Sequence, residues 1–458
     1  MANVINFEDY PLFEKGCLTN FNDQYYYRHD LGQIDSSFPW TKLVNYFEKK
    51  FSQNKQKKGR RRLFSIRTEL ATIVLKGITG LSDKQIMERL AQDWVYQRFA
   101  RVKILDFHQN FTILSDIRER YSKVTNIDEL QDLFASHWSD YLSAVEGVLM
   151  DATVFKSNIS YPNEIELLWE SIQWLHKRIK VISRTLGQKT IRSKYKEIEK
   201  VYKRISTQKE PRYKEKKKLM RRELNLLSKY LEHFAYLVEQ LPSGISSLYP
   251  SEQETYITIK KIYQQRRAKY EGKQVKNLIL SLYKPYVHCI YRGKRSGRWE
   301  YGEKYHLFLL GGMVWIDYIS NENFNECNRL ESVVRKSEQY TGHFISYLGA
   351  DRIYATRSNR AYLKSKAIKE NFVPLGRPIQ NKLLREQQRI LKQALNAARN
   401  SKMEGIIGVL KVHYNTERVK VKAQKTERMI IFFSLMSHNA KEYSRSNTEK
   451  AQEQKQAG

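Results

Sequence analysis

Apolar residues between positions 63 and 140 recur at helical spacing and predict an α-helical domain. The stretch LFSIRTELATIVLKGITGLSDKQIMERLAQD contains two candidate helices separated by Gly80-Leu81. Ser82 is a good N-cap, and Gln85 follows three residues later, as in a capping box. A short helix, a tight turn and a second capped helix are typical of a helix-turn-helix, although an ordinary helical bundle gives the same pattern.

A heptad pattern marks the middle of the chain. Apolar residues step by four and three from Ile191 to Ile205 and again from Met220 to Leu241, with a break at residues 206–211. This spacing predicts two helices, most simply an antiparallel helical hairpin. A third helix is expected from Glu252.

Strand-like periodicity appears on either side of this block. The apolar segment VEGVLMDATVF predicts a strand around Asp151, and RWEYGEKYHLFLL with MVWIDYIS predicts a hairpin that turns at Gly311-Gly312. The elements expected after the hairpin are a helix (324–340), a strand ending at Asp351, a helix (359–368), the short strand NFVPLG and a long helix from Lys382 to beyond Glu404.

With the helical block set aside as an insertion, this order is that of an α/β domain with a ribonuclease-H-like core. The expected fold is therefore a ribonuclease-H-like catalytic core with an inserted α-helical hairpin region and an N-terminal α-helical domain. The expected parts are an N-terminal segment and basic linker (1–62), the helix-turn-helix-like domain (63–140), the catalytic domain (141–185 and 280–444), the basic helical insertion (186–279) and a disordered tail (445–458).

Charge makes a polyanion the leading partner. Lys and Arg number 81 against 49 Asp and Glu, a formal net charge of +32. Residues 189–222 alone hold 15 basic and 4 acidic residues, a net of +11. An excess of this size favours nucleic acid over an anionic membrane. No apolar run is long enough to cross a bilayer, and the three cysteines form neither a disulfide framework nor a zinc pattern.

Three carboxylates are the candidates for chemistry. In a ribonuclease-H-like fold the first and fourth strands are neighbours, so Asp151 and Asp351 are expected close together, and a later helix would bring Glu404. A charge in the apolar strand VLMDATV is costly unless it has a role. Such carboxylates bind hard ions, and two divalent ions roughly 4 Å apart stabilise both oxygens of a phosphodiester transfer. Lys411, seven residues after Glu404, lies on the same helix face and could meet a phosphate.

Three segments resemble the DDE transposases of bacterial insertion sequences, in the branch of family five and family eleven-eighty-two. They are DATVFKSNISYPNEIELLWE, GADRIYATRSNRAYLKSKAI and ARNSKMEGIIGVLKVHYNTERVKVKAQKTERMIIFFSLMSHNAKEY. The third has Lys411 and Tyr414 after its Glu, and Asn439 on the next helix. Departures from the family pattern are Ile353 in place of a Gly and Ile406-Ile407 after the Glu-Gly pair.

The resemblance implies that Asp151, Asp351 and Glu404 are the catalytic residues and metal ligands, for two ions of Mg²⁺ (or Mn²⁺). It implies a transposase that binds terminal inverted repeats, cleaves DNA and transfers strands as a homodimer on double-stranded DNA. The residues expected to contact DNA are Lys411, Arg399, Lys189, Arg192, Lys194, Lys203, Arg204, Arg212, Lys216, Lys217, Lys218, Arg221 and Arg222.

Two alternatives remain open on sequence grounds. One is a ribonuclease-H-like DNA nuclease without strand transfer, and the other is a domesticated, non-catalytic DNA-binding protein. For all three functions we expect no membrane association and a cytoplasmic, bacterial, nucleoid-associated location.

Overall fold

The computed structural model describes residues 4–6, 20–53, 62–105, 111–160, 163–291, 299–377 and 380–457. The chain forms two compact units. Unit 1 comprises Met1–Lys156 and Lys304–Gly458, and unit 2 comprises Ser157–Glu303. Most of the basic run expected in the N-terminal linker lies outside the described residues. In the described part of the chain, no helix combines the length and apolar character needed to cross a bilayer.

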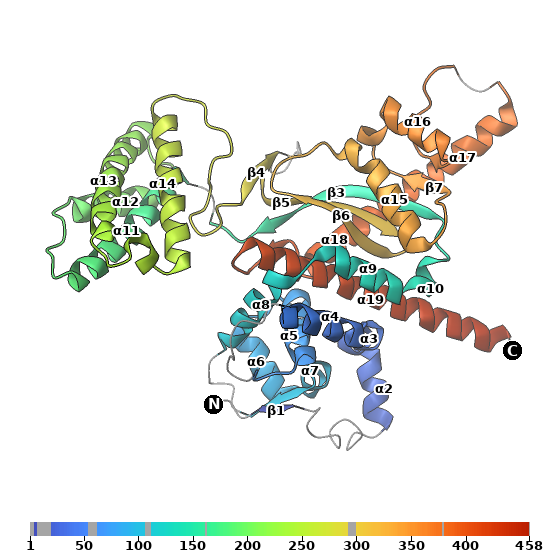
Figure 1. Cartoon of the computed structure of the whole chain (residues 1–458). Helices are drawn as coiled ribbons and strands as arrows, with labels where there is room; N and C mark the ends of the chain where they lie inside the picture. The colour runs from blue at the N-terminus through green and yellow to red at the C-terminus, as the bar shows by residue number, and fades with distance from the viewer. Residues whose placement is uncertain are drawn as a thin grey trace. The chain divides into compact units, whose positions relative to one another are not determined.

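The N-terminal part of unit 1 is a bundle of short helices (Figure 1). Its elements are β1 (Val4–Asn6), α2 (Asn20–Arg28), α3 (Asp30–Ser37), α4 (Trp40–Gln53), α5 (Ile66–Thr79), α6 (Asp83–Gln92), α7 (Trp94–Ala100), β2 (Val102–Ile104), α8 (Ile113–Val124), α9 (Ile127–His137) and α10 (Ser139–Leu142). β1 and β2 pair antiparallel. The helices α2–α4, which fall in the expected N-terminal segment and basic linker (1–62), pack into this bundle and contribute to its core.

The turn between α5 and α6 forms as the sequence predicts. Gly80 ends α5 in the left-handed conformation (φ 63°), and the Ser82 hydroxyl accepts from the backbone N–H of Gln85 in a complete capping box. Most of α5 is buried. In α6, by contrast, Lys84, Gln85 and Arg89 are exposed. Of these two helices, α6 is therefore the one with a polar face open to solvent.

A mixed sheet forms the second part of unit 1. Its strands are β3 (Gly147–Ser157), β5 (Trp299–Leu310), β6 (Met313–Ser320), β7 (Tyr347–Gly349), β8 (Lys369–Glu370) and β9 (Arg418–Val419). They lie in the order β6-β5-β3-β7-β8, with β9 also paired to β3. The hairpin β5–β6 is antiparallel, whereas β3–β7 and β7–β8 are parallel. β5 begins in unit 2, where its first residues pair antiparallel with β4 (His288–Tyr291).

Helices flank this sheet and join it to the N-terminal bundle (Figure 1). They are the short η3 (Glu326–Arg329), α15 (Leu330–Thr341), the short η4 (Arg352–Tyr354), α16 (Arg357–Ser365), α17 (Lys382–Ala398), the π-helix η5 (Arg399–Met403), α18 (Glu404–His413) and α19 (Gln424–Ala457). Helix α19 packs against α3, α5, α8 and β6. The buried Asn439 of α19 accepts from the Val314 N–H (2.8 Å) and donates to its carbonyl (2.9 Å), so this family-like residue has a structural role on β6.

Unit 2 is helical. It contains α11 (Glu164–Thr185), α12 (Tyr195–Ser206), α13 (Tyr213–Glu239), the short η2 (Gly244–Ser247) and α14 (Pro250–Tyr270). The predicted hairpin corresponds to α12 and α13, but α11 packs along α13 as well. The compact unit therefore includes α11 and β4, which the sequence division had assigned to the catalytic domain. Trp169 stacks between Tyr195 and Tyr202 (ring centroids 5.1 Å from each), which ties α11 to α12.

Two local expectations differ from the structure. The segment NFVPLG is not a strand; β8 lies just before it, at Lys369–Glu370, and Pro374 lacks the N–H that a ladder needs. The tail expected to be disordered continues α19 to Ala457. Its Arg445 pairs with Glu442 (2.7 Å) and Glu449 (3.7 Å), and such pairs three and four residues apart stabilise a helix.

Candidate functional site

Two of the three predicted carboxylates meet in unit 1, where β7 ends beside the middle of β3. The parallel register pairs Leu149 of β3 with Gly349 of β7, and Asp151 and Asp351 each follow two residues later. Both carboxylates contact the same guanidinium: Nη2 of Arg399 lies 3.5 Å from Asp151 Oδ2 and 3.7 Å from Asp351 Oδ2. One cation therefore bridges two acidic groups, which leaves this cluster of three with a formal charge of −1.

The two aspartates have different surroundings. The Asp151 side chain is 18% exposed, and its Oδ1 accepts from the backbone N–H of Ala152 (2.8 Å). Asp351 is 55% exposed, and its Oδ1 accepts from the backbone N–H of Arg352 (2.6 Å) at the start of η4. The site thus has one sheltered carboxylate and one open to solvent.

Arg399, which the sequence predicts to contact DNA, lies against the two carboxylates in the structure, and its contact with DNA stays a prediction. Its side chain is only 14% exposed, and Nη1 donates to Asn400 Oδ1 (3.0 Å). Its Nε is buried without an acceptor among the described residues.

Glu404 begins α18 one turn beyond Arg399, and the turn between them is a π-helix. In an α-helix the fifth residue along points about 140° away. A π-turn closes with an i to i+5 hydrogen bond, so the fifth residue returns to nearly the same face. The π-helix therefore directs Glu404 toward the side that carries Arg399, while the fully buried Met403 anchors the turn.

The structure does not gather the three carboxylates into one cluster. Glu404 is exposed. Among the described residues, no three His, Cys, Asp or Glu side chains are grouped closely enough to hold a metal ion. The assignment of Glu404 as third ligand stays a prediction.

A small residue permits the close approach of the helix that carries Arg399. A Cβ on Gly349 would lie 2.6 Å from Leu149 Cδ2 and 3.4 Å from the Leu395 carbonyl oxygen. Helix α17 can therefore cross close to the end of β7, and this brings Arg399 to the two aspartates.

A buried polar network supports the loop after Asp351, and sequence reasoning missed it. His306 on β5 contacts Asp317 Oδ2 through Nδ1 (2.9 Å) and the Tyr354 hydroxyl through Nε2 (2.6 Å). Arg329 donates to both oxygens of Asp317 (2.8 and 3.0 Å). The available signal was a polar residue in each of two apolar strands, YHLFLL and MVWIDYIS.

Burial and hydrogen bonding act in opposite directions on Asp317. Burial raises its pKa, but hydrogen bonds from His306, Arg329 and Ser332 outweigh burial and hold the pKa well below its ordinary value. The pKa of Tyr354 is raised, first by burial and then by the negative charges of Glu326 and Asp151. Asp317 is therefore an anion at neutral pH, and the Tyr354 hydroxyl is neutral. These two states suit a network of hydrogen bonds that holds the structure together.

The remaining predicted DNA contacts fall into two places. Lys411 lies on α18, two turns beyond Glu404, in unit 1. The others lie in unit 2, in the segment before α12, on α12 and at the start of α13. All of these are exposed except the half-buried Arg222, which pairs with Glu197 (3.4 Å). Unit 2 by itself thus presents a basic surface between residues 189 and 222.

The N-terminal part of unit 1 matches a known family. Residues 20–120 match the family described as transposase domain (DUF772), and this match supports a transposase family for the chain. The matched segment includes α2–α4, which the sequence division had left outside the helical domain. No curated protein and no solved structure matches the chain.

Proposed function

We propose that this protein is a DDE-type transposase that binds the terminal inverted repeats of its element and catalyses DNA cleavage and strand transfer. The observation that carries the proposal is the pair Asp151, on β3, and Asp351, just after the neighbouring parallel strand β7, which Arg399 bridges. The transposase-domain match supports the same class of function. The strand order β6-β5-β3-β7-β8, with an antiparallel hairpin and a parallel pair of strands beyond β3, supports a ribonuclease-H-like core.

The donor set suits a hard divalent cation. The two aspartates already hold one positive group, and carboxylate oxygens are the ligands that Mg²⁺ and Mn²⁺ prefer. Asp151 and Asp351, with Glu404 as the third ligand, would hold two ions. Such ions supply the Lewis acidity that activates water and stabilises the attacking and leaving oxygens.

The protein's own side chains have distinct tasks in this proposal. Arg399 offsets one of the two negative charges of the paired carboxylates. The basic surface of unit 2 would neutralise phosphates along the element end, so binding weakens as salt concentration rises. Such contacts position DNA without reading its sequence. The exposed polar face of α6 is the surface in the matched domain that suits base reading.

The test separates cleavage from binding. Asp151→Ala, Asp351→Ala and Glu404→Ala are each expected to abolish Mg²⁺-dependent cleavage of DNA carrying the element ends, with end binding largely retained. Asp116→Asn removes an exposed carboxylate of α8 and serves as the matched control. Cleavage by any of the three alanine variants would remove that residue from the catalytic set.

A strand-transfer assay distinguishes the two alternatives. A nuclease would cut the ends without joining them to a target, and a domesticated binding protein would bind DNA without metal-dependent cutting. Joining of a cleaved 3′ end to target DNA by the wild-type protein is the result expected of a transposase.

A further inference from the structure

A buried asparagine lies where the pairing of β7 with β8 ends. The last backbone pair is Leu348 opposite Glu370, and Asn371 follows directly. The side-chain Oδ1 of Asn371 accepts from the Ala350 N–H (3.0 Å), and its Nδ2 donates to the Ala350 carbonyl (2.9 Å). The side-chain amide therefore makes the two hydrogen bonds that a backbone would make, and it extends the sheet to the residue just before Asp351.

The same amide also contacts helix α17. Its Nδ2 donates to Asn396 Oδ1 (2.7 Å). An asparagine amide has two N–H donors and one accepting oxygen, and here both donors and the oxygen are used. An ionised aspartate lacks the donors, and an aliphatic side chain of this size lacks all three functions. The three contacts therefore require an amide at position 371.

The helix that Asn371 contacts also carries Arg399. Asn396 lies three residues before Arg399, and residues at this spacing are neighbours on a helix surface. Two links thus join α17 to the end of β7. The first runs from Asn396 through Asn371 to Ala350. The second runs from Arg399 to Asp351, the next residue of the chain.

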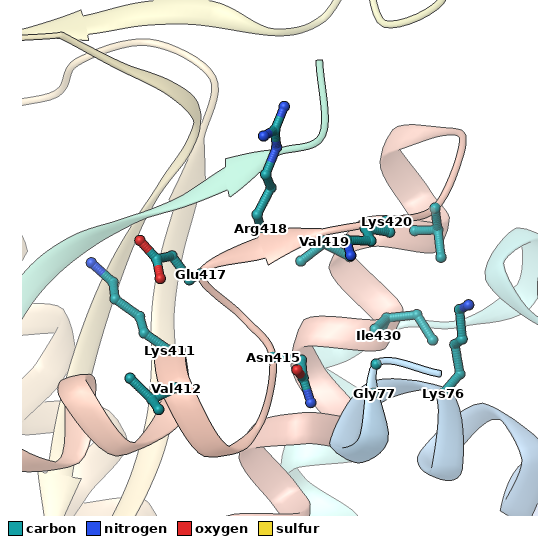
Figure 2. A pocket seen from close by; sticks show the side chains of 12 residues that line it. Lys76, Gly77, Lys411, Val412, Asn415, Glu417, Arg418, Val419, Lys420 and Ile430 are labelled. Carbon is teal, nitrogen blue, oxygen red and sulfur yellow. The ribbon is translucent and has the colours of Figure 1, made fainter. Parts of the chain in front are cut away.

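The helical rod formed by α17, η5 and α18 is held at its other end as well. After α18, Asn415 donates from Nδ2 to the Ile78 carbonyl (2.7 Å) at the end of α5 (Figure 2). A Cβ on Gly80 would lie 2.8 Å from Asn415 Oδ1, so the turn after α5 lies close against this asparagine. The segment that contains Glu404 therefore runs between two asparagine contacts, one with the sheet and one with the N-terminal bundle.

We infer that Asn371 is a positioning residue of the site, which holds Asp351 at a fixed spacing from the rod that leads to Glu404. The inference rests on the proposed function and deepens it. Asn371 acts through Ala350 on the strand side and through Asn396 on the helix side. Because ligands from the sheet and from the rod are then arranged in advance, a divalent ion binds without the free-energy cost of ordering them.

The first measurement is Mn²⁺ binding to the full-length, DNA-free protein by isothermal titration calorimetry. Asn396→Ala removes the link at an exposed position, where the change should not disturb the core. We expect the dissociation constant for Mn²⁺ to rise roughly fivefold, which is what one hydrogen bond is worth. Gln393→Ala, an exposed residue of the same helix one turn earlier, is the control and should bind Mn²⁺ as the wild type does. Loss of binding in Asp151→Ala assigns the measured ion to the site.

A double-mutant cycle shows whether the two asparagines act as one link. Asn371→Ala should weaken Mn²⁺ binding at least as much as Asn396→Ala, and adding the second substitution should then change the dissociation constant less than twofold. The effect of Asn396→Ala should persist in an Arg399→Gln background, where the guanidinium no longer competes with the ion. If Asn371→Ala does not fold, the comparison of Asn396→Ala with Gln393→Ala decides alone.

A second readout is the Mg²⁺ concentration that half-saturates cleavage of DNA carrying the element ends, which should rise by the same factor. Wild-type Mn²⁺ affinity in Asn396→Ala overturns the inference, even if the variant melts at a lower temperature, because the role of the link would then be structural only. Fully additive effects of the two asparagine substitutions also overturn it. A wild-type protein that binds Mn²⁺ and shows the expected coupling but never cuts DNA overturns the proposed function and supports this inference. Absence of Mn²⁺ binding by the wild type overturns both.

Discussion

His306 Nε2 lies 2.6 Å from the Tyr354 hydroxyl, and this hydrogen bond ties strand β5 to the short helix that follows Asp351. When Nδ1–H donates to Asp317, Nε2 accepts from the tyrosine O–H. The backbone N–H of Tyr354 in turn donates to the Asp351 carbonyl (3.0 Å). The position of Asp351 is therefore supported by a buried chain of polar groups and not by the strand alone.

Tyr354→Phe should destabilise unit 1. The substitution removes the hydroxyl and leaves a buried imidazole nitrogen without a partner, which costs about 1–3 kcal/mol. The free energy of unfolding, measured with urea, should fall by that amount. Tyr318→Phe is the control because the Tyr318 side chain is partly exposed on β6 and its ring contact with Arg329 persists. Equal stability of Tyr354→Phe and wild type would show that the hydrogen bond contributes nothing.

Arg399→Gln should tighten the binding of divalent ions. The guanidinium now competes for the oxygens of Asp151 and Asp351, so its removal leaves them open to a metal. An ion pair of this exposure is worth about 1 kcal/mol, which corresponds to roughly fivefold in the dissociation constant. Isothermal titration calorimetry of the DNA-free protein with Mn²⁺ measures this dissociation constant.

Lys402→Gln provides the matched control for this measurement. It removes one positive charge three residues further along, from an exposed position of the π-helix. We expect it to change Mn²⁺ affinity far less than Arg399→Gln does. Weaker Mn²⁺ binding by Arg399→Gln would contradict competition and would make the arginine a support for the bound ion.

Glu223→Met should stabilise unit 2 at neutral pH. Glu223 on α13 is fully buried, both carboxylate oxygens lack hydrogen-bond partners among the described residues, and burial raises its pKa well above the ordinary value. Below about pH 4.5 the folded and unfolded states are both protonated and the group carries no charge penalty. Stability is then lost as pH rises toward the raised pKa, because only the unfolded state ionises readily.

The methionine variant should remove this pH dependence and gain on the order of 1–3 kcal/mol at pH 7. Thermal unfolding of wild type and variant between pH 4 and 8 measures both effects. Glu239→Met, at the exposed end of the same helix, should leave the pH profile of unit 2 as it is in the wild type. If the stability of Glu223→Met changed with pH as that of the wild type does, the Glu223 carboxyl group would be solvated in the folded protein.

The pattern of the sequence predicted those helices, strands and turns that depend on residues close together in the chain. The heptads predicted α12 and α13, Gly311 makes the turn of the β5–β6 hairpin in the left-handed conformation, and the capping box begins α6 at Ser82. Each of these features depends on residues within about a turn of one another. The sequence also predicted that Asp151 and Asp351 lie close together, because the order of the elements is that of a ribonuclease-H-like core, in which the first and fourth strands are neighbours; in the structure β3 and β7 are paired.

Contacts between distant residues were not predictable in this way. Nothing in the local pattern of Arg399 shows that it meets carboxylates 248 and 48 positions earlier in the chain. The partners His306 and Asp317 were visible only as polar interruptions of apolar strands. The helix at the C-terminal tail was missed for a different reason. The tail has no apolar pattern, but ion pairs such as that of Arg445 with Glu442 can stabilise a helix without one.

The π-helix at Arg399–Met403 amounts to one surplus residue in an otherwise continuous helical rod from α17 to α18. Deleting a single codon there would restore regular α-helical geometry and so favour folding of the rod. The same deletion would leave Glu404 four residues from Arg399, about 40° away around the helix axis and therefore still on nearly the same face. Without a deletion, the same residues wound as a regular α-helix would point Glu404 about 140° away from Arg399, so the direction of Glu404 depends on how this segment is wound.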